Sequence, residues 1–368
     1  MCTIECSIIV PFHINVNQLE YCLRGLLLND LADSEIIVVG HGVPSINEYI
    51  KDHRIKIVKL EHAVPYPTAI NNAVNHSVGN LLFFLDQDTY VHENWFENIL
   101  KFYNRKKCED SIGVASSKLI CPSSGNIIDF GIAFTQYNSP HPWRGCRADF
   151  DITNQNHKVQ AACSAAMLID RNLFLSVGGF DEELPFAYCD VDLCLKLKEV
   201  GYYTWVVSDA KAYHFNAFPK LSKYFYKEDT KALFSIRNHH RIEHDISKYL
   251  YANYQFYASR HQIQNSYFLI DMATILDRSW YLDFITQKLE FNILDRISIP
   301  YSQRDSSEVC LYSALSWSVL RKKCPILFFV DSMNSLLNND LWFNCRDCDA
   351  DLVVDRNGNV LAIQDLCK

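Results

Sequence analysis

Short apolar runs and segments with helical spacing alternate along the N-terminal part of the chain. Apolar runs predict strands at residues 4–10, 35–39, 55–60 and 81–85. Apolar positions three to four residues apart predict helices at residues 17–29 and 68–78. Helices that separate strands in this order are typical of an α/β sheet with parallel neighbours, so we expect an α/β fold.

The pattern changes near residue 240. Up to that point the alternation of strands, loops and helices continues, over residues 110–134, 136–157, 161–180 and 190–201. Beyond it, long polar-aromatic stretches almost without glycine predict helices, and alternating apolar runs around Asn357-Gly358 indicate a hairpin. We expect two domains: residues 1–240, and a mainly helical C-terminal extension, residues 241–368, whose role the sequence does not indicate.

The composition is that of an ordinary globular protein, with 49% hydrophobic and 21% charged residues. A formal net charge of −8 argues against nucleic acid as a main partner, because phosphate binding requires a basic surface. Pro11 and His13 interrupt the first apolar segment, and no apolar run approaches the roughly 18 residues that a membrane span needs. A cytoplasmic chain is expected, with peripheral association at the inner face of the membrane left open.

The chain has 14 cysteines, a number that in a secreted protein would suggest a disulfide framework. Cys6, Cys163 and Cys194 lie inside apolar patterns, where a thiol behaves as a small hydrophobic side chain. Reduced, buried thiols are therefore expected. Cys345-x-x-Cys348 is a weak signal for zinc, because no second pair or histidine cluster lies near it in the sequence.

Two carboxylates, Asp86 and Asp88, follow directly after the apolar run at residues 81–85. On an extended segment, residues two apart point to the same side, and such oxygen pairs suit a hard divalent cation that binds a diphosphate. Ligands of parallel sheets bind at the carboxyl ends of the strands, which is where these residues fall. The alternative is a strand that simply ends in solvent.

A second pair with the same spacing, Asp190 and Asp192, stands at the start of the predicted helix at 190–201. Acids there complement the helix N-terminus, so a capping role is the simplest interpretation. Asp190 is also a candidate general base for an acceptor hydroxyl. His214 follows a predicted strand; a lone histidine is more often structural, although imidazole is a common metal ligand.

An ordered set of motifs then resembles the family 2 glycosyltransferases of the GT-A fold. The set is IIVPFH, EIIVV, AINNAV, FFLDQD, GNIIDFG, SAAMLIDRNLF, VGGFDEEL, CDVDLCLKLKEVGY and AYH, over about residues 4–240. The resemblance implies a Rossmann-like domain with a mixed, mostly parallel central sheet flanked by helices. It also implies a metal-dependent, inverting transfer of sugar from a nucleotide donor.

The resemblance assigns a role to each matching residue. Asp88 and His214 would hold Mn²⁺ or Mg²⁺, Asp190 would be the base, and Asp86 would lie beside the nucleotide ribose. The residues expected around the donor are Pro11, Phe12, His13, Gly40, His41, Asn71 and Asp86, and those expected around the acceptor are Trp143 and Asp192.

The chain departs from the family pattern at three places. Gly40-His41-Gly42 stands where family members carry acidic residues that read the nucleotide base. Cys189 stands where an acid usually precedes the base, and His13 stands near a usual aromatic position. The stretch GHGVPS also resembles a dinucleotide-binding fingerprint, but the third glycine is missing and Pro44 interrupts it, which argues against a dehydrogenase.

The function expected is a hexosyl- or N-acetylhexosaminyltransferase that uses a UDP- or dTDP-linked donor. The acceptor expected is a hydroxyl of a glycan or lipid-linked glycan, in the synthesis of a surface polysaccharide. The alternative is a sugar-nucleotide or glycan-binding protein that kept the fold without activity. A third interpretation makes residues 241–368 a docking module, because residues 220–234 and 320–330 interleave aromatic, apolar and basic side chains that could touch a partner or a membrane.

Overall fold

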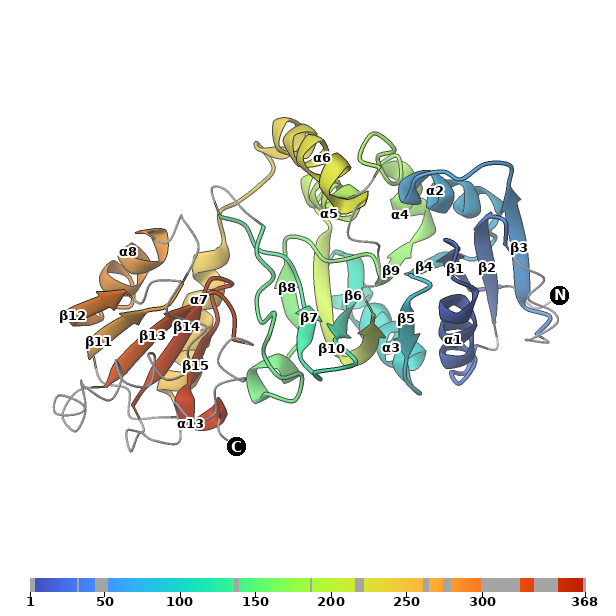
Figure 1. Ribbon diagram of the computed structural model, residues 1–368. Coiled ribbons are helices and arrows are strands. Elements are labelled where there is room, and N and C mark those ends of the chain that lie inside the picture. The colour runs from blue at the N-terminus through green and yellow to red at the C-terminus, as the bar shows by residue number, and fades with distance from the viewer. Residues whose placement is uncertain are drawn as a thin grey trace. The chain divides into compact units, whose positions relative to one another are not determined.

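The computed structural model describes most of the chain, and its contacts divide it into two compact units (Figure 1). The described residues are 4–31, 33–43, 52–135, 139–185, 187–215, 222–260, 265–273, 279–298, 325–333 and 350–366. The first unit consists of residues 1–132 and 147–243, and the second of residues 133–146 and 244–368. The boundary expected from the sequence fell after residue 240 and did not include the excursion of residues 133–146 into the second unit.

A ten-stranded sheet forms the centre of the first unit. Its main path runs β3 (Ile55–Leu60), β2 (Ser34–His41), β1 (Cys6–Pro11), β4 (Leu81–Leu85), β9 (Ala166–Asp170), β6 (Ile112–Ile120), β10 (Tyr203–His214), β5 (Thr89–Val91). Two short strands pair beside this path, β7 (Ile127–Asp129) on β6 and β8 (His157–Val159) on β10. Strand β9 runs antiparallel between β4 and β6, so that β3, β2, β1, β4, β6 and β10 share one direction. The expected mixed, mostly parallel α/β sheet is confirmed.

Helices flank this sheet (Figure 1). They are α1 (Val16–Leu26), α2 (Tyr66–His76), α3 (Trp95–Glu109), α4 (Arg171–Ser176), α5 (Cys189–Glu199) and α6 (Ser222–Asn238), with a short 3₁₀ helix at Asp151–Asn154. The predicted helices at 17–29, 68–78 and 190–201 correspond to α1, α2 and α5, within a few residues at each end.

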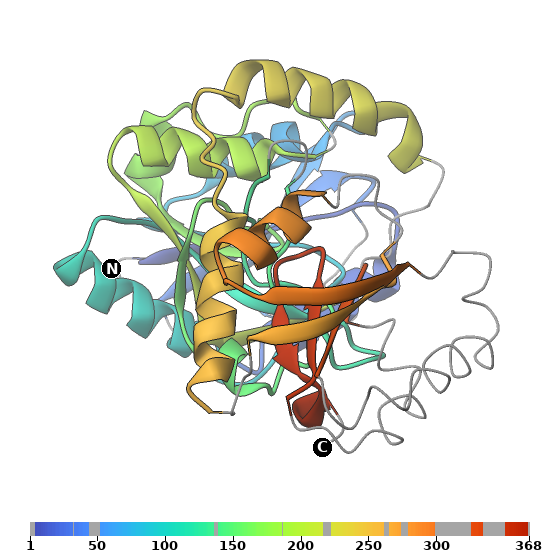
Figure 2. The ribbon, with the colours of Figure 1, turned by 90° about the vertical axis from the view of Figure 1, so that its left-hand side faces the viewer.

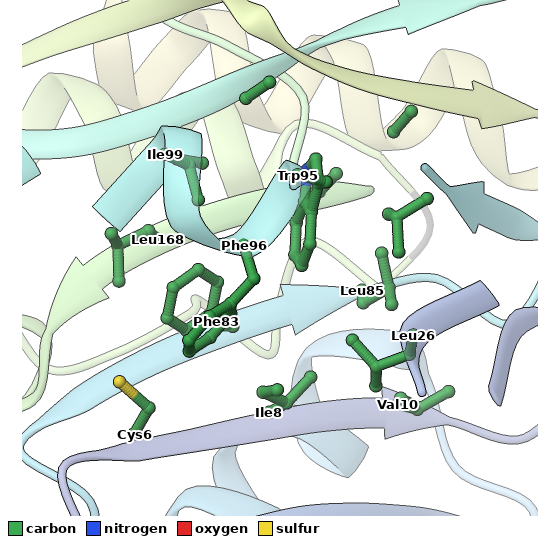
Figure 3. Packing of buried hydrophobic residues seen from close by; sticks show 14 of the residues in the cluster. Cys6, Ile8, Val10, Leu26, Phe83, Leu85, Trp95, Phe96, Ile99 and Leu168 are labelled. Carbon is green, nitrogen blue, oxygen red and sulfur yellow. The ribbon is translucent and has the colours of Figure 1, made fainter. Parts of the chain in front are cut away.

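Strand β4 is buried on both faces, which explains its unbroken apolar sequence. On one face, Phe83 packs against Trp95 and Phe96 of α3, with ring centroids 5.7 and 4.8 Å away (Figure 3). On the other face, Phe84 packs against Phe174 and Phe180, at 5.3 and 5.1 Å. Packing on both sides fixes the position of the residues that follow the strand.

The second unit contains its own five-stranded sheet, in the order β12 (Asn292–Ser298), β11 (Ser266–Asp271), β13 (Ile326–Val330), β14 (Leu352–Asp355), β15 (Val360–Ala362) (Figure 2). The helices α7 (Ile246–Ala258), α8 (Ser279–Gln287) and α13 (Ile363–Leu366) accompany it. Strands β14 and β15 form an antiparallel hairpin around Asn357-Gly358, which confirms the predicted turn. The C-terminal extension, expected to be mainly helical, is thus helical only in part. The parallel strands β11–β14 were not predicted from the sequence.

Residues 139–146 are anchored in the second unit by Trp143, which is 2% exposed. Its backbone N–H donates to Asn359 Oδ1 at 2.5 Å, and its indole N–H donates to Asn253 Oδ1 at 3.1 Å. Its ring also meets Tyr249 edge-on, with centroids 5.4 Å apart. This tryptophan, expected at the acceptor, is held in place by contacts inside the second unit.

In the described part of the chain, no helix combines the length and apolar character needed to cross a membrane. Among the described cysteines, Cys6, Cys22, Cys146, Cys189 and Cys194 are buried thiols without a disulfide partner. Cys345 and Cys348 lie outside the described residues, as do parts of the segments 220–234 and 320–330.

Candidate active site

The two carboxylates after β4 lie in a tight turn. The Asp86 N–H donates to Ala165 O at 3.0 Å, and the Thr89 N–H donates back to Asp86 O at 2.9 Å, which begins β5. The segment is not extended here, contrary to the expectation from the sequence. The turn, together with the pairing of β5, brings Asp86 and Asp88 to one place.

His214 joins these carboxylates at the end of β10. Strands β5 and β10 are antiparallel, and Thr89 pairs with His214 in their register. His214 Nε2 lies 3.1 Å from Asp88 Oδ1 and 3.8 Å from Asp86 Oδ2. The structure therefore brings together the two residues that the resemblance assigns to the metal, and adds Asp86 to them.

The three side chains fit a divalent cation. One ligand atom from each residue lies within 4.8 Å of the others, and in the described part of the chain no other such group of histidine, cysteine and acidic side chains occurs. Two of their buried atoms, His214 Nδ1 and Asp86 Oδ1, have no hydrogen-bond partner among the described residues. Carboxylate oxygens with one imidazole are suitable ligands for Mn²⁺ or Mg²⁺.

The electrostatics of the group also favour a cation. Burial is the main reason that the pKa of Asp86 rises to about 7, and the neighbouring carboxylates of Asp88 and Asp190 raise it further, against the opposing effect of His214. Burial opposes the charged form of His214, but the hydrogen bond with Asp88 and the two nearby carboxylates outweigh it, so that its pKa is raised. A cation that binds this group therefore competes with protons on Asp86 and His214.

Asp190 lies in the first turn of α5, directly after Tyr188 and Cys189. Its carboxylate accepts hydrogen bonds from the backbone N–H of Ser164, at 3.1 Å, and of Val191, at 2.9 Å. Burial raises its pKa, and these backbone donors oppose the rise. A carboxylate with a raised pKa is a stronger base than one in water, as a general base requires.

The segment Ser164-Ala165 connects Asp190 with the metal group. Ser164 donates its N–H to Asp190, and the carbonyl of Ala165 accepts the N–H of Asp86. The hydroxyl of Tyr66 donates to Ser164 Oγ at 3.0 Å and completes this connection. The proposed base and the Asp-x-Asp turn are thus held by the same two residues.

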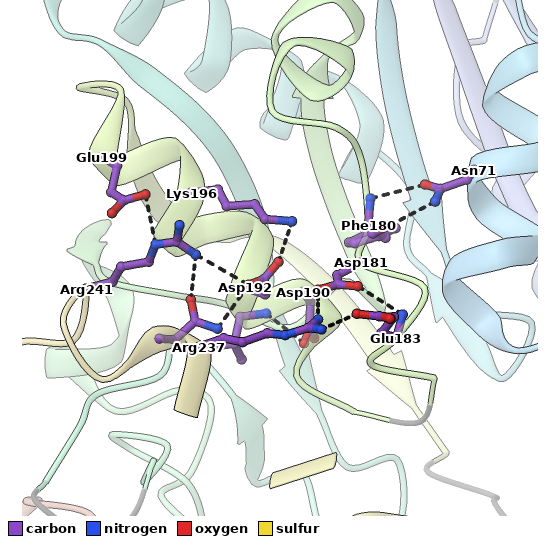
Figure 4. Close-up of polar contacts among 12 residues, drawn as sticks. Asn71, Phe180, Asp181, Glu183, Asp190, Asp192, Lys196, Glu199, Arg237 and Arg241 are labelled. Carbon is purple, nitrogen blue, oxygen red and sulfur yellow. Dashed lines mark hydrogen bonds and ion pairs between the residues drawn. The ribbon is translucent and has the colours of Figure 1, made fainter. Parts of the chain in front are cut away.

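Asp192 faces away from Asp190, because residues two apart on a helix do not share a face. Its side chain is 2% exposed and is engaged by Lys196 at 2.7 Å, by the amide of Asn238 at 3.0 Å and by Arg241 at 3.8 Å (Figure 4). These contacts tie α5 to the end of α6. The expected role of Asp192 in acceptor binding stays a prediction, and its partners favour a structural role.

The residues expected around the donor begin where β1 ends at Pro11. Phe12 is buried and donates its N–H to Val39 O at 2.7 Å. His13 is exposed, and its backbone is held by Gln87, which the sequence analysis did not single out. The only indication of this role in the sequence was the position of Gln87 between the two carboxylates. The turn at this position points the Gln87 side chain toward the loop after β1.

Close packing explains why glycine stands at position 40, where family members carry an acidic residue. A Cβ atom at this position would lie 2.5 Å from the carbonyl oxygen of Phe12, closer than real atoms approach. The close contact of β2 with the residues after β1 therefore excludes any side chain here. The neighbouring His41 is exposed, and its Nδ1 lies 3.2 Å from Leu60 O.

Asn71 of α2 uses its side-chain amide to hold the loop after α4 (Figure 4). Its Nδ2 donates to Phe180 O at 2.9 Å and to Glu182 Oε1 at 3.0 Å, and its Oδ1 accepts the Phe180 N–H at 3.1 Å. Gly179, at φ +68°, allows this approach, since a Cβ there would lie 2.8 Å from Asn71 Oδ1. The expected contact of Asn71 with the donor stays a prediction.

The C-terminal part of α6 fastens the acidic loop that leads to Asp190. Arg237 Nη1 lies 2.7 Å from Asp181 Oδ2, and its Nη2 bonds Glu183 (Figure 4). The ring of Tyr188, whose φ is +68°, stacks on Phe234 with centroids 4.7 Å apart. These contacts were not predicted, because the sequence alone does not indicate which basic residue of α6 pairs with which acidic residue of the loop.

Part of the sequence is similar to known proteins. Residues 7–173 match the model of the family described as glycosyl transferase family 2. An uncharacterized protein, y4gI, of Sinorhizobium fredii is 28% identical over 228 residues, which are 56% of this chain and 24% of that protein. The O-antigen biosynthesis protein RfbC of Myxococcus xanthus is 27% identical over 212 residues, 54% of this chain and 16% of that protein.

These matches therefore span about a quarter or less of the relatives' own lengths. Among solved structures, one described as GalNAc-T7 with UDP, GalNAc and Mn²⁺ has a TM-score of 0.45 and 15% identity. The similarity covers 58% of this chain and 44% of that one.

Proposed function

Since residues 7–173 of this chain match the model of the family 2 glycosyltransferases, we propose that the protein is a metal-dependent, inverting glycosyltransferase that uses a nucleotide-sugar donor. The observation that carries the proposal is the convergence of Asp86, Asp88 and His214 at one point. Asp190 is linked to that point through Ser164 and Ala165.

Each of these residues has a role in the proposed reaction. Asp88 and His214, with Asp86 beside them, would hold Mn²⁺ or Mg²⁺. A cation bound there supplies positive charge to the diphosphate of the donor and stabilises it as the leaving group. Asp190 accepts the proton of the acceptor hydroxyl, whose oxygen bonds to the anomeric carbon as the bond to the diphosphate breaks. One base opposite one leaving group gives inversion.

The nature of the substrates is a further part of the proposal. We propose a UDP- or dTDP-linked hexose or N-acetylhexosamine as the donor, and a hydroxyl of a glycan or lipid-linked glycan as the acceptor. The name of the Myxococcus xanthus relative supports a role in surface polysaccharide synthesis. With a lipid-linked acceptor, the protein would act in the cytoplasm, at the inner face of the membrane.

The test combines donor binding with turnover. The full chain is screened by thermal shift against UDP-, dTDP- and GDP-linked sugars with and without Mn²⁺, since a ligand that binds the folded state raises its stability. We expect a selective shift that requires Mn²⁺. Transfer, or slow hydrolysis of the same donor, should fall by about 10²–10⁴ in Asp190→Asn, while the thermal shift persists.

Three outcomes separate the alternatives. A Mn²⁺-dependent shift without any turnover by the unmodified protein would favour a sugar-nucleotide-binding protein. Unchanged turnover in Asp190→Asn would remove Asp190 as the base. The absence of a shift with every donor would contradict the proposal as a whole.

A further inference from the structure

A row of aromatic side chains covers the outer face of the strand pair β5–β10. Side chains alternate between the two faces of a strand. Thr89 and Val91 of β5, and Ala212 and His214 of β10, point inward and are buried. The outward positions, which are half-buried or exposed, belong to Tyr90, His92, Lys211, Tyr213 and Phe215.

These rings contact one another in sequence. Tyr21 of α1 stacks on Tyr90, with centroids 4.5 Å apart and an angle of 25°, and meets Phe215 edge-on at 5.6 Å. His92 continues the row, at 6.0 Å from Tyr90 and 5.0 Å from Tyr213. Tyr21 and Phe215 are nevertheless 48% and 44% exposed. The row is therefore a fixed aromatic surface that faces solvent.

A glycine of α1 makes room for this row. A Cβ at Gly25 would lie 2.6 Å from the ring of Tyr90, so that the ring rests directly on the helix backbone between Tyr21 and Gly25. A ring held on both sides in this way keeps its orientation without a ligand. A surface that is ordered beforehand loses little conformational entropy when it binds.

One end of the row adjoins the candidate active site. Phe215 follows His214 directly, and its N–H donates to Asp88 O at 3.0 Å. Tyr90 lies two residues after Asp88. A ligand that extends from the reaction centre along β5 and β10 would therefore meet the rings first.

The other end of the row opens into a polar pocket of about 280 Å³. Its lining includes His92, which also belongs to the row, and the side chains of Glu93, Asn98, Asp209 and Lys211. The volume is close to the lower end of the range of about 300–1,000 Å³ for small-molecule sites. It suits one small polar group with several hydrogen-bonding positions.

We propose that the aromatic row and the pocket bind the glycan of the acceptor, beyond the sugar that is extended. This inference rests on the proposed function. A sugar ring presents an apolar face of C–H groups, which packs on aromatic rings, and an edge of hydroxyls, which bonds to carboxylates, amides and ammonium groups. An anionic lipid surface would require a basic rim, whereas Glu93 and Asp209 stand beside the single Lys211 here.

The experiment measures glycan binding without donor or metal. The full chain is titrated with a panel of tetrasaccharides of glucose, galactose, mannose, rhamnose and N-acetylglucosamine. We expect at least one to bind, and Tyr21→Ala and Phe215→Ala each to weaken that binding about 5- to 10-fold, the usual effect of losing one aromatic contact. Tyr251→Ala is the matched control, because Tyr251 is an exposed helical tyrosine of the second unit. The affinity of this variant for the glycan should equal that of the unmodified chain.

Several results would overturn the inference. One is that the unmodified chain binds no glycan at millimolar concentration. Another is that Tyr21→Ala and Phe215→Ala both bind glycan with the affinity of the unmodified chain. Binding to vesicles of phosphatidylglycerol that depends on Tyr21 and Phe215, without glycan binding, would assign the surface to a membrane instead. Glycan binding that depends on the rings in a protein without transferase activity would contradict the proposed function and the acceptor role, and would support only the assignment of this surface to a glycan.

Discussion

Gln87 and His13 exchange two hydrogen bonds: the His13 N–H donates to Gln87 Oε1 at 2.6 Å, and Gln87 Nε2 donates to His13 O at 2.8 Å. The side-chain amide thus pairs with a backbone as a neighbouring strand would. Because Gln87 stands between Asp86 and Asp88, it joins the loop after β1 to the turn that carries the candidate metal ligands. The residue between the two carboxylates therefore sets where the loop after β1 lies relative to them.

Replacement of Gln87 by methionine keeps the size of the side chain and removes both hydrogen bonds. Two such bonds contribute about 1–3 kcal/mol, so we expect the KM for the donor to rise about 5- to 100-fold with a smaller change in kcat. Gln18→Met removes only the longer contact of 3.3 Å to Gln87 and is the control. An unchanged KM in Gln87→Met would show that the loop is held by other means.

The affinity for Mn²⁺ should rise with pH up to about pH 7. The pKa of Asp86 is raised, mainly by burial, to about 7, and that of His214 is raised as well, so below these values a cation must displace protons. Isothermal titration at about pH 6 and about pH 8 should give at least a tenfold weaker affinity at the lower value, with proton release. Asp86→Asn should reduce this pH dependence, whereas an affinity independent of pH would contradict the cation site.

Asp192 should matter for stability and Asp190 for turnover, although the two share one motif. Asp192→Ala leaves Lys196 and Arg241 without their buried partner, and we expect a loss of about 3 kcal/mol in the free energy of unfolding. Asp190→Ala removes two backbone hydrogen bonds, but it also removes a buried carboxylate whose charged form burial disfavours, and should cost less, about 1–2 kcal/mol. Denaturant unfolding of both variants, beside their turnover per folded molecule, tests the division. A loss of turnover in folded Asp192→Ala as large as in Asp190→Ala would return Asp192 to the acceptor site.

Gly40→Ala should destabilise the first unit. The added methyl group would meet the carbonyl oxygen of Phe12 at 2.5 Å, and relief of such a contact requires a backbone shift that costs about 1–3 kcal/mol. His41→Ala, at the exposed neighbour, should change stability by less than about 0.5 kcal/mol. Equal midpoints for Gly40→Ala and the unmodified chain in urea would argue that β2 and the residues after β1 can separate.

The local sequence was sufficient to predict the bounds of strands whose apolar run ends where the strand ends. Residues 55–60 and 81–85 were predicted with the bounds of β3 and β4, because each run is limited by polar residues at both ends. His214 and Asp88 could be paired only through the family resemblance. Their 126-residue separation is closed by the pairing of β5 with β10, which no local pattern announces.

The roles of individual polar residues were harder to predict. Asp190 and Asp192 have the same spacing as Asp86 and Asp88, yet the first pair diverges on a helix and the second converges in a turn. Asn71 was assigned by resemblance, and its amide is occupied by the backbone of Phe180. Such roles depend on which distant segment reaches the residue, and that information lies in the packing of the whole unit.

The excursion of residues 133–146 has a consequence for how the protein is made. Trp143 finds its hydrogen-bond partners on Asn253 and Asn359, which leave the ribosome much later. At a synthesis rate of roughly 5–20 residues per second, this indole waits on the order of ten seconds or more for its pocket. During that interval the nascent chain carries this tryptophan without the two asparagines that hold it in the second unit. A chain truncated after residue 243 would lack both hydrogen-bond partners of Trp143.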